Sequence, residues 1–147
     1  MIEQKSRRCW TTALIAAVTL PGCGGDAGAK LEDTRKAAYA AFNAAVESFN
    51  AGDYAAAEPK LTEALDLNGL NGDVFCDATT KRAVCWGASG KYDAAIADLD
   101  KLGAAAPNQG EIFAARAFIL KKQGKAAQAN AAMAQARKFD RTIKEFK

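Results

Sequence analysis

Residues 52–65 of the chain read GDYAAAEPKLTEAL, and this stretch decides the fold. It opens on a glycine and an aspartate, residues that form turns and cap the start of a helix, and it continues as an alanine-rich helical segment. Pro59 removes one hydrogen bond from that helix. The turn glycine returns at Gly90 and Gly124, after spacings of 38 and 34 residues. The chain is therefore predicted to repeat a helix-turn-helix unit.

Three further positions recur in register with these glycines. Alanine stands five residues after each glycine and seven residues before it, and a large apolar residue stands nine residues after it. The nine residues are Ala57, Ala95, Ala129, Ala45, Ala83, Ala117, Leu61, Leu99 and Met133. Small side chains at such positions let the two helices of an antiparallel pair approach closely. We therefore expect these residues to lie where the helices of each pair touch.

The repeated pattern resembles the tetratricopeptide repeat (TPR) family over about residues 37–141. Tyr54 and Tyr92 fill the aromatic position two residues after the glycine, which Ala126 lacks, and Pro107 stands where this family ends a second helix. The resemblance implies an all-α fold of three stacked helix-turn-helix hairpins, a short right-handed α-solenoid. The expected repeats cover about residues 38–71, 76–109 and 110–143. A plain alanine-rich helical bundle is the alternative.

The composition favours helices and excludes several classes of enzyme. Of the 147 residues, 35 are alanine, three are proline and none is histidine, which fits one helical domain with a packed core. Without histidine the chain has no Ser-His-Asp triad, Cys-His dyad or His-based zinc site. The sequence also contains no phosphate-binding glycine loop and no paired nucleophile and base. We therefore expect a protein that is not an enzyme and holds neither cofactor nor metal.

The first 20 residues carry the pattern of an export signal. Lys5, Arg7 and Arg8 precede an uncharged, mostly apolar run of eleven residues, 10–20. As a helix this run is about 16 Å long, roughly half of the ~30 Å hydrocarbon core of a membrane, so it is too short to span. The pattern therefore predicts a signal peptide.

Residues 20–23, Leu-Pro-Gly-Cys, resemble the lipobox of bacterial lipoproteins, from which the proline departs. The resemblance implies that residues 1–22 are a signal peptide and that Cys23 is lipidated. Residues 23–30 are then a flexible tether and residues 31–147 the TPR domain. Gly24 after the cysteine resembles the class destined for the outer membrane, which implies a lipid-anchored protein facing the periplasm. Cleavage after Ala29 would instead release a soluble secreted chain.

The first helix of each repeat is expected to line an inner groove. In the first repeat the candidate residues follow a stripe on one helical face. The groove candidates are Tyr39, Phe42, Val46 and Phe49 in the first repeat, Lys81 and Val84 in the second, and Phe118, Lys121 and Lys122 in the third. An aromatic wall beside lysines suits an amphipathic helix or an extended peptide with an acidic end. Alternatively, Phe42 and Phe49 are core residues that fill the first hairpin.

Charge is unevenly distributed along the chain. Residues 23–110 carry 8 basic and 13 acidic residues, a net charge of −5, whereas residues 111–147 carry 9 basic and 3 acidic residues, a net charge of +6. In a bacterial envelope this basic pole favours an acidic protein patch or anionic lipid head groups over nucleic acid. A solvated helix face is the alternative interpretation.

Cys76 and Cys85 form an even pair in an oxidising compartment, which makes a disulfide one interpretation and two separate buried thiols another. In a continuous helix, nine residues correspond to about 13.5 Å of rise, whereas a disulfide needs Cα atoms within about 7 Å. The bond therefore requires residues 68–80 to fold back. Thiol redox chemistry is less favoured because the pair lacks C-x-x-C spacing.

The sequence therefore predicts a non-enzymatic scaffold or adaptor, lipid-anchored in the bacterial envelope, which binds a helix or peptide of another envelope protein in a TPR groove. The alternatives are a self-associating structural protein, a secreted TPR protein if Cys23 is not lipidated, and, less favoured, a thiol-active factor. The partner and the pathway stay open at this point.

Overall fold

The computed structural model describes residues 25–146, and within them it contains six α-helices and no β-strand. The helices are α1 (Gly25–Asn50), α2 (Tyr54–Asp66), α3 (Gly72–Ala88), α4 (Tyr92–Leu102), α5 (Gln109–Lys122) and α6 (Ala126–Phe139). The all-α fold that the composition predicts is confirmed. The predicted signal peptide and the lipidation site at Cys23 lie outside the described residues.

Three turn glycines end the first helix of each successive pair. Gly52, Gly90 and Gly124 have φ angles of +78°, +81° and +77°, in the left-handed region that favours glycine. In each turn the residue after the glycine donates its N–H to the carbonyl five residues earlier. These bonds join Asp53 to Ser48 (3.0 Å), Lys91 to Trp86 (2.8 Å) and Lys125 to Leu120 (2.9 Å). The spacing of the glycines therefore marks three C-terminal helix caps of the Schellman type.

Side-chain caps fix the start of two helices. Asp53 Oδ1 accepts the N–H of Ala56 at 3.0 Å at the start of α2, as the quoted stretch predicts. Asn71 Oδ1 accepts the N–H of Val74 at 2.9 Å at the start of α3. Each cap satisfies one of the backbone donors that a helix leaves unpaired at its N-terminus.

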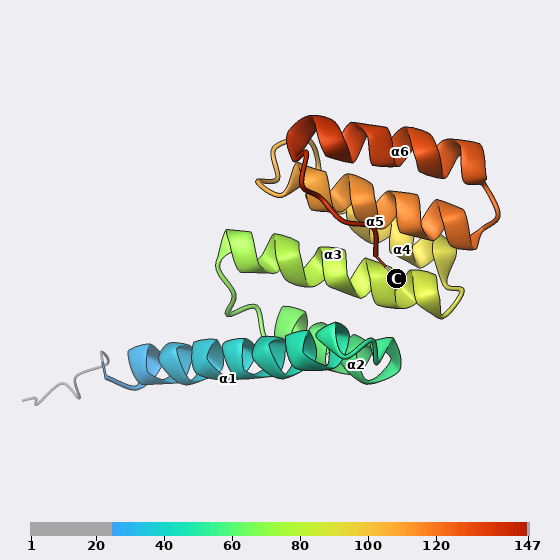
Figure 1. Ribbon diagram of the computed structural model, residues 1–147. Coiled ribbons are helices and arrows are strands. Elements are labelled where there is room, and N and C mark those ends of the chain that lie inside the picture. The colour runs from blue at the N-terminus through green and yellow to red at the C-terminus, as the bar shows by residue number, and fades with distance from the viewer. Residues whose placement is uncertain (1–24, 147) are drawn as a thin grey trace, which may run out of the picture.

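The helices pack as three sequential hairpins, α1 with α2, α3 with α4, and α5 with α6 (Figure 1). Neighbouring hairpins join through α3, which also packs against α2 and α5, and through the contact between α4 and α5. All nine of the recurring alanine and large apolar positions are buried. The residues that the sequence predicts at the contacts between paired helices are therefore all buried, as such contacts require.

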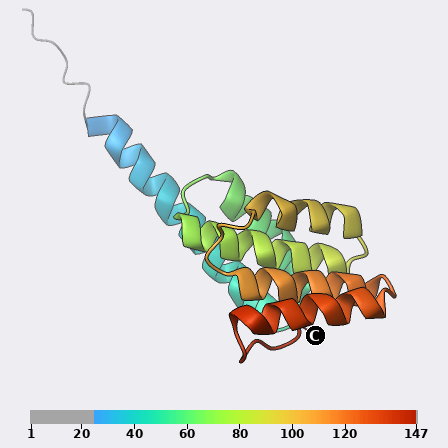
Figure 2. The same cartoon turned by 90° about the horizontal axis from the view of Figure 1, so that it is seen from above.

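The start of α1 differs from the sequence prediction. Residues 23–30 are predicted to be a flexible tether, whereas α1 already includes Gly25 and continues without a break to Asn50. Figure 2 shows this first part of α1 projecting beyond the other helices. Leu31 on the projecting part is 68% exposed. The difference has a local cause, because the six residues before Leu31 extend a helix that is already nucleated, and extension costs less than nucleation.

The loop between α2 and α3 folds back onto α1. A β-carbon built on Gly69 would stand 2.9 Å from the Cα of Arg35, so only glycine permits this approach. The N–H of Asn71 donates to the Tyr39 hydroxyl at 3.4 Å. The first glycine spacing is longer than the second, and the loop between α2 and α3 that lies within it covers the middle of α1.

Within residues 25–146, no helix combines the length and the apolar character that crossing a membrane requires.

Candidate functional site

Four aromatic rings from distant parts of the chain meet on one face of the fold. Phe49 lies in the last turn of α1, Tyr54 begins α2, Phe118 lies in α5, and Phe146 belongs to the segment after α6. We call these four residues the aromatic cluster. Its ring centroids are 5.1 Å apart for Phe49–Tyr54, 6.0 Å for Phe49–Phe146, 6.3 Å for Tyr54–Phe118 and 6.4 Å for Phe118–Phe146. Tilted and edge-to-face pairs in this range attract beyond simple area burial.

The cluster is well packed. Phe49 is 9% exposed and Phe118 is 5% exposed, and both belong to the main hydrophobic core. Burial raises the pKa of the Tyr54 phenol above its ordinary value, and the neighbouring Cys85 acts in the same direction. The aromatic cluster thus joins the first hairpin to α5 and to the segment after α6.

Three lysines border the cluster. The Lys81 Nζ lies 5.7 Å from the centroid of Phe49, and the Lys122 Nζ lies 5.3 Å from the centroid of Phe118. Both distances are within the ~6 Å range of a cation–π contact. The Lys121 Nζ lies 3.2 Å from the Glu145 carboxylate. The face therefore combines four aromatic rings with three lysines, of which Lys81 is paired with Asp77 and Lys121 with Glu145.

Residues 140–146, which we call the C-terminal segment, run back over this face. Asp140 Oδ1 accepts the N–H of Thr142 at 2.8 Å and its hydroxyl at 2.7 Å, which turns the chain after α6. Hydrogen bonds from the Thr142 side chain and backbone lower the pKa of Asp140 below its ordinary value. Ile143 then packs on the α5–α6 cluster, and Phe146 reaches the main core. Figure 1 shows the segment crossing α5 towards α3.

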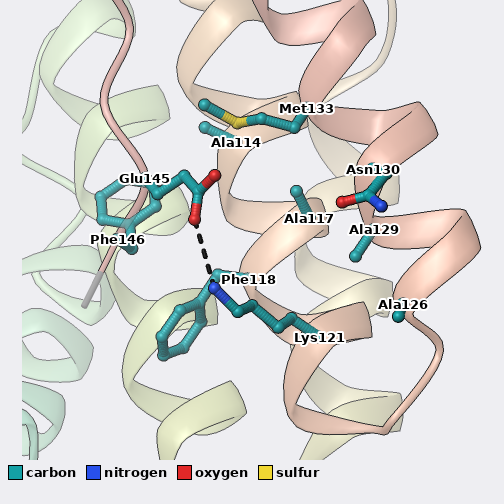
Figure 3. Close-up of a pocket in the computed structure, with 10 residues that line it drawn as sticks. All are labelled: Ala114, Ala117, Phe118, Lys121, Ala126, Ala129, Asn130, Met133, Glu145 and Phe146. Carbon is teal, nitrogen blue, oxygen red and sulfur yellow. Dashed lines mark hydrogen bonds and ion pairs between the residues drawn. The ribbon is translucent and has the colours of Figure 1, made fainter.

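A small hollow lies where the C-terminal segment passes α5 and α6 (Figure 3). Its volume is about 100 Å³, and small side chains such as Ala114, Ala117 and Ala129 form much of its wall. Figure 3 shows the Glu145 carboxylate directed at Lys121 at its edge. Pockets for small molecules measure about 300–1,000 Å³. The hollow is therefore too small for a typical metabolite.

The predicted groove residues divide into two groups. Phe49, Lys81, Phe118, Lys121 and Lys122 gather around the aromatic cluster, as described above.

The other groove candidates lie elsewhere. Val84 is 0% exposed and belongs to the core. Phe42 is half-buried and packs on the same core, and Val46 is also half-buried. The Tyr39 hydroxyl accepts a hydrogen bond from the α2–α3 loop, and the Arg35 guanidinium carbon lies 6.0 Å from the centroid of the Tyr39 ring. The alternative interpretation of Phe42 and Phe49 as residues that fill the core therefore fits their burial.

Two residues of the site were not singled out from the sequence, Glu145 and Phe146. The available signal was the apolar pair Ile143 and Phe146, spaced by three residues within an otherwise charged stretch. That spacing alone does not show which surface the pair covers, because the contacts of Phe146 come from α1 and α5, far away in the sequence.

A buried ion pair joins α3 to α4. Asp98 is 0% exposed, and its Oδ2 accepts a hydrogen bond from Arg82 Nε at 2.8 Å and lies 2.7 Å from Arg82 Nη2 in an ion pair. Lys101 Nζ contacts Asp98 Oδ1 at 2.9 Å. The Arg82 guanidinium also stacks on Trp86, 4.7 Å from the ring centroid. All polar atoms of the carboxylate are thus matched by donors, which fits a structural pair.

The network continues to α2 through Glu58. Its Oε1 accepts the Trp86 indole N–H at 2.7 Å and contacts Lys91 Nζ at 2.6 Å. Burial alone would raise the pKa of Glu58, but the hydrogen bonds from Lys91 and Trp86 and the charges of Lys91 and Arg82 hold it below its ordinary value. Glu58 is therefore a fixed carboxylate that connects the first and second hairpins.

Both described cysteines are free thiols. Cys76 and Cys85 lie on the continuous helix α3, so the fold-back that a disulfide requires does not occur. Cys85 is 1% exposed, and burial, with a further effect of the Glu58 charge, raises its pKa to about 12. Burial and the charge of Asp73 also raise the pKa of Cys76. Neither thiol has the lowered pKa that redox-active cysteines need.

Among residues 25–146, no group of His, Cys, Asp and Glu side chains has an arrangement that would hold a metal ion. No known protein family, curated protein or solved structure matches the chain.

Proposed function

We propose that the chain is a non-enzymatic scaffold of TPR type, lipid-anchored at Cys23 in the bacterial envelope, which binds a helix or peptide of another envelope protein on the face that carries the aromatic cluster. The observation that carries the proposal is the occupancy of this face by a short non-helical segment, residues 140–146. A surface that already accepts one peptide segment has the shape and chemistry for another.

The TPR interpretation is supported by local geometry. The chain has three successive helical hairpins with a positive-φ glycine in each turn, and the small residues predicted at the seams are buried. A solenoid of three hairpins places the first helix of each hairpin along one surface. Phe49, Lys81 and Phe118 come from the first helices α1, α3 and α5 and lie around one cluster.

Self-association is a second candidate that the charge distribution favours. Basic side chains on α6 and after it, such as Arg137, Lys138 and Arg141, are exposed, and so are acidic side chains near the other end, such as Glu32 and Asp33. The net charges of −5 and +6 on the two parts of the chain would let one copy meet another end to end. A molecular mass that falls to that of a monomer at high salt would support this candidate.

Photo-crosslinking in the envelope tests the scaffold proposal. A photoreactive residue replaces Lys122, which borders the cluster, or Lys138, which lies on α6 and serves as the control. Crosslinks to an envelope protein from position 122 and not from position 138 are expected. Crosslinks from position 138 alone would assign binding to the basic pole and contradict the proposal.

The anchor is tested separately by fractionation. Cys23→Ser removes the thiol that lipidation requires, so we expect the variant to move from the membrane fraction to the soluble fraction. The Cys9→Ser variant, changed within the predicted signal peptide, is the matched control. Membrane association that survives in the Cys23→Ser variant would contradict the lipid anchor.

A further inference from the structure

The C-terminal segment contacts the rest of the fold through two adjacent residues of different chemistry. Phe146 places its ring 6.0 Å from Phe49 and 6.4 Å from Phe118, centroid to centroid. Glu145, the residue before it, contacts the Lys121 ammonium at 3.2 Å. The face therefore contacts an acidic side chain and the aromatic side chain that directly follows it in the sequence.

We propose that residues 140–146 are an intramolecular competitor, and that the partner of this face is a peptide segment in which an acidic residue stands next to an aromatic residue and displaces them. The inference rests on the proposed function, because it takes the face as a binding groove. It adds the chemistry of the partner and a form of regulation, since the face is open only when the segment leaves.

The segment is held in a way that permits displacement. Within the described part of the chain, the backbone of residues 143–146 makes one hydrogen bond, from Ile143 N–H to the Asp140 carbonyl at 3.3 Å, which is local. The ion pair with Lys121 is solvent-exposed on both sides, with side-chain exposures of 69% for Lys121 and 54% for Glu145. Exposed pairs of this kind contribute little binding energy. Attachment thus depends mainly on the side chains of Ile143 and Phe146.

The segment carries no net charge, because Arg141 and Lys144 balance Asp140 and Glu145. Its site is bordered by Lys121 and Lys122, while the third lysine, Lys81, is already paired with Asp77. A partner with net negative charge would therefore be attracted to these lysines more strongly than the segment is. The segment competes nonetheless, because its attachment to α6 gives it an effective concentration on the order of millimolar.

The test measures binding of the segment supplied as a separate peptide. The probe is a fluorescent synthetic peptide with the sequence of residues 140–147, DRTIKEFK, and its affinity is measured by anisotropy. The full chain is compared with the double variant Glu145→Ala/Phe146→Ala, whose own segment no longer competes. Lys144→Ala is the matched control, because this exposed residue lies in the same segment.

We expect the double variant to bind the peptide at least tenfold more tightly than the wild-type chain and the Lys144→Ala control. Peptides with Ala in place of the Glu or the Phe should bind the double variant at least tenfold more weakly than the unchanged peptide. Equal affinity of the double variant and the wild type, or no binding by either, would overturn the proposal. A wild-type dimer that becomes monomeric in the double variant would assign the face to a second copy of the chain and would overturn the proposed partner.

A second variant covers the case in which the double variant does not fold. Ile143→Ala shortens one of the two side chains on which attachment depends and leaves the six helices unchanged, so it should release the segment, whereas Lys144→Ala should not. Cleavage by trypsin after Arg141 reports release, and it should be faster in Ile143→Ala than in Lys144→Ala. Equal cleavage rates would overturn the proposal.

The outcomes also separate this inference from the proposed function. Crosslinks from position 122 without peptide binding would leave the scaffold proposal standing and reject the competing segment. Peptide binding without crosslinks from position 122 would support the competing segment and reject the scaffold proposal.

Discussion

Gly87 and Ile119 approach so closely across the α3–α5 interface that a β-carbon built on Gly87 would stand 2.7 Å from Ile119 Cγ1. Ile119 is fully buried, and its branched side chain has little freedom to move away. The contact joins the second and third hairpins, since α3 and α5 belong to different pairs. The absence of a side chain at Gly87 therefore sets how closely two neighbouring hairpins pack.

The first prediction concerns this contact. Gly87→Ala should lower the free energy of unfolding by about 1–2 kcal/mol, because overpacking costs about 1–3 kcal/mol and the gain in helix propensity returns only about 0.5–1 kcal/mol. Chemical denaturation followed by circular dichroism measures the change. Gly72→Ala is the control, since a β-carbon there meets nothing within 4 Å, and it should be neutral or stabilising. Equal effects of the two variants would contradict the close contact.

The second prediction compares two Arg–Asp pairs with the same sequence separation. Arg82 pairs with Asp98, which has a side-chain exposure of 1%, whereas Arg116 contacts Asp100, which has an exposure of 60%. Arg82→Ala should cost about 3 kcal/mol of stability, because it leaves a buried carboxylate with only Lys101 as its partner. Arg116→Ala should cost less than about 1 kcal/mol. Similar losses in both variants would show that Asp98 is hydrated.

The turns and seams of the fold were predictable from sequence because their causes are local. Gly52 and Gly90 adopt a positive φ that other residues rarely accept, so a recurring glycine marks each turn. The alanines at the seams recur in register with these glycines for a similar reason, because close helix packing requires small side chains. The start of α1 was predicted incorrectly, because glycine content suggested a tether where an existing helix is simply extended.

The candidate site was predictable only in part. Phe49 and Phe118 were identified because they fall on the expected face of a first helix, and both lie in the aromatic cluster. Val84 was predicted on the same inner face, but it is buried, because α3 packs against helices of both neighbouring hairpins. The position of Phe146 depends on the path of residues 140–146 across α5, which no local pattern specifies.

The third prediction concerns the thiols. At pH 8, iodoacetamide should alkylate Cys76 at least tenfold faster than Cys85, because Cys85 is 1% exposed and burial raises its pKa to about 12. Peptide mapping by mass spectrometry reads each site separately. In denaturant both cysteines should react at similar rates. Fast labelling of Cys85 in the native protein would contradict its burial.

The same pKa shift gives a pH dependence of stability. The unfolded Cys85 thiol ionises near its ordinary value of 9.0, and the folded one ionises only at about 12. The neutral, buried thiol of Cys85 therefore makes its full contribution to the free energy of unfolding below pH 9, and this contribution is lost as the pH rises from 9 towards 12. Denaturation midpoints of the wild type should fall more steeply over this range than those of Cys85→Ala. Parallel curves would show that Cys85 does not cause the loss.

The fourth prediction separates packing from binding on the aromatic face. Phe118→Ala should lower the free energy of unfolding by about 3 kcal/mol or more, since the ring is 5% exposed and contacts both Tyr54 and Phe146. Phe42→Ala should cost clearly less, because Phe42 is half-buried. Thermal unfolding followed by circular dichroism measures both. A near-neutral Phe118→Ala would show that the cluster opens in solution.

Because Phe118→Ala is expected to destabilise the fold strongly, it cannot be used to test whether the aromatic face binds a partner. A loss of binding in Phe118→Ala would follow from damage to the fold as readily as from loss of a contact, because the same ring closes the core. Lys122→Ala removes a charge from the rim of the cluster while leaving the rings in place. If the face binds an acidic partner, this variant should weaken binding and reduce its salt dependence at unchanged stability. Weaker binding with the same salt dependence would mean that the partner contacts the rings alone.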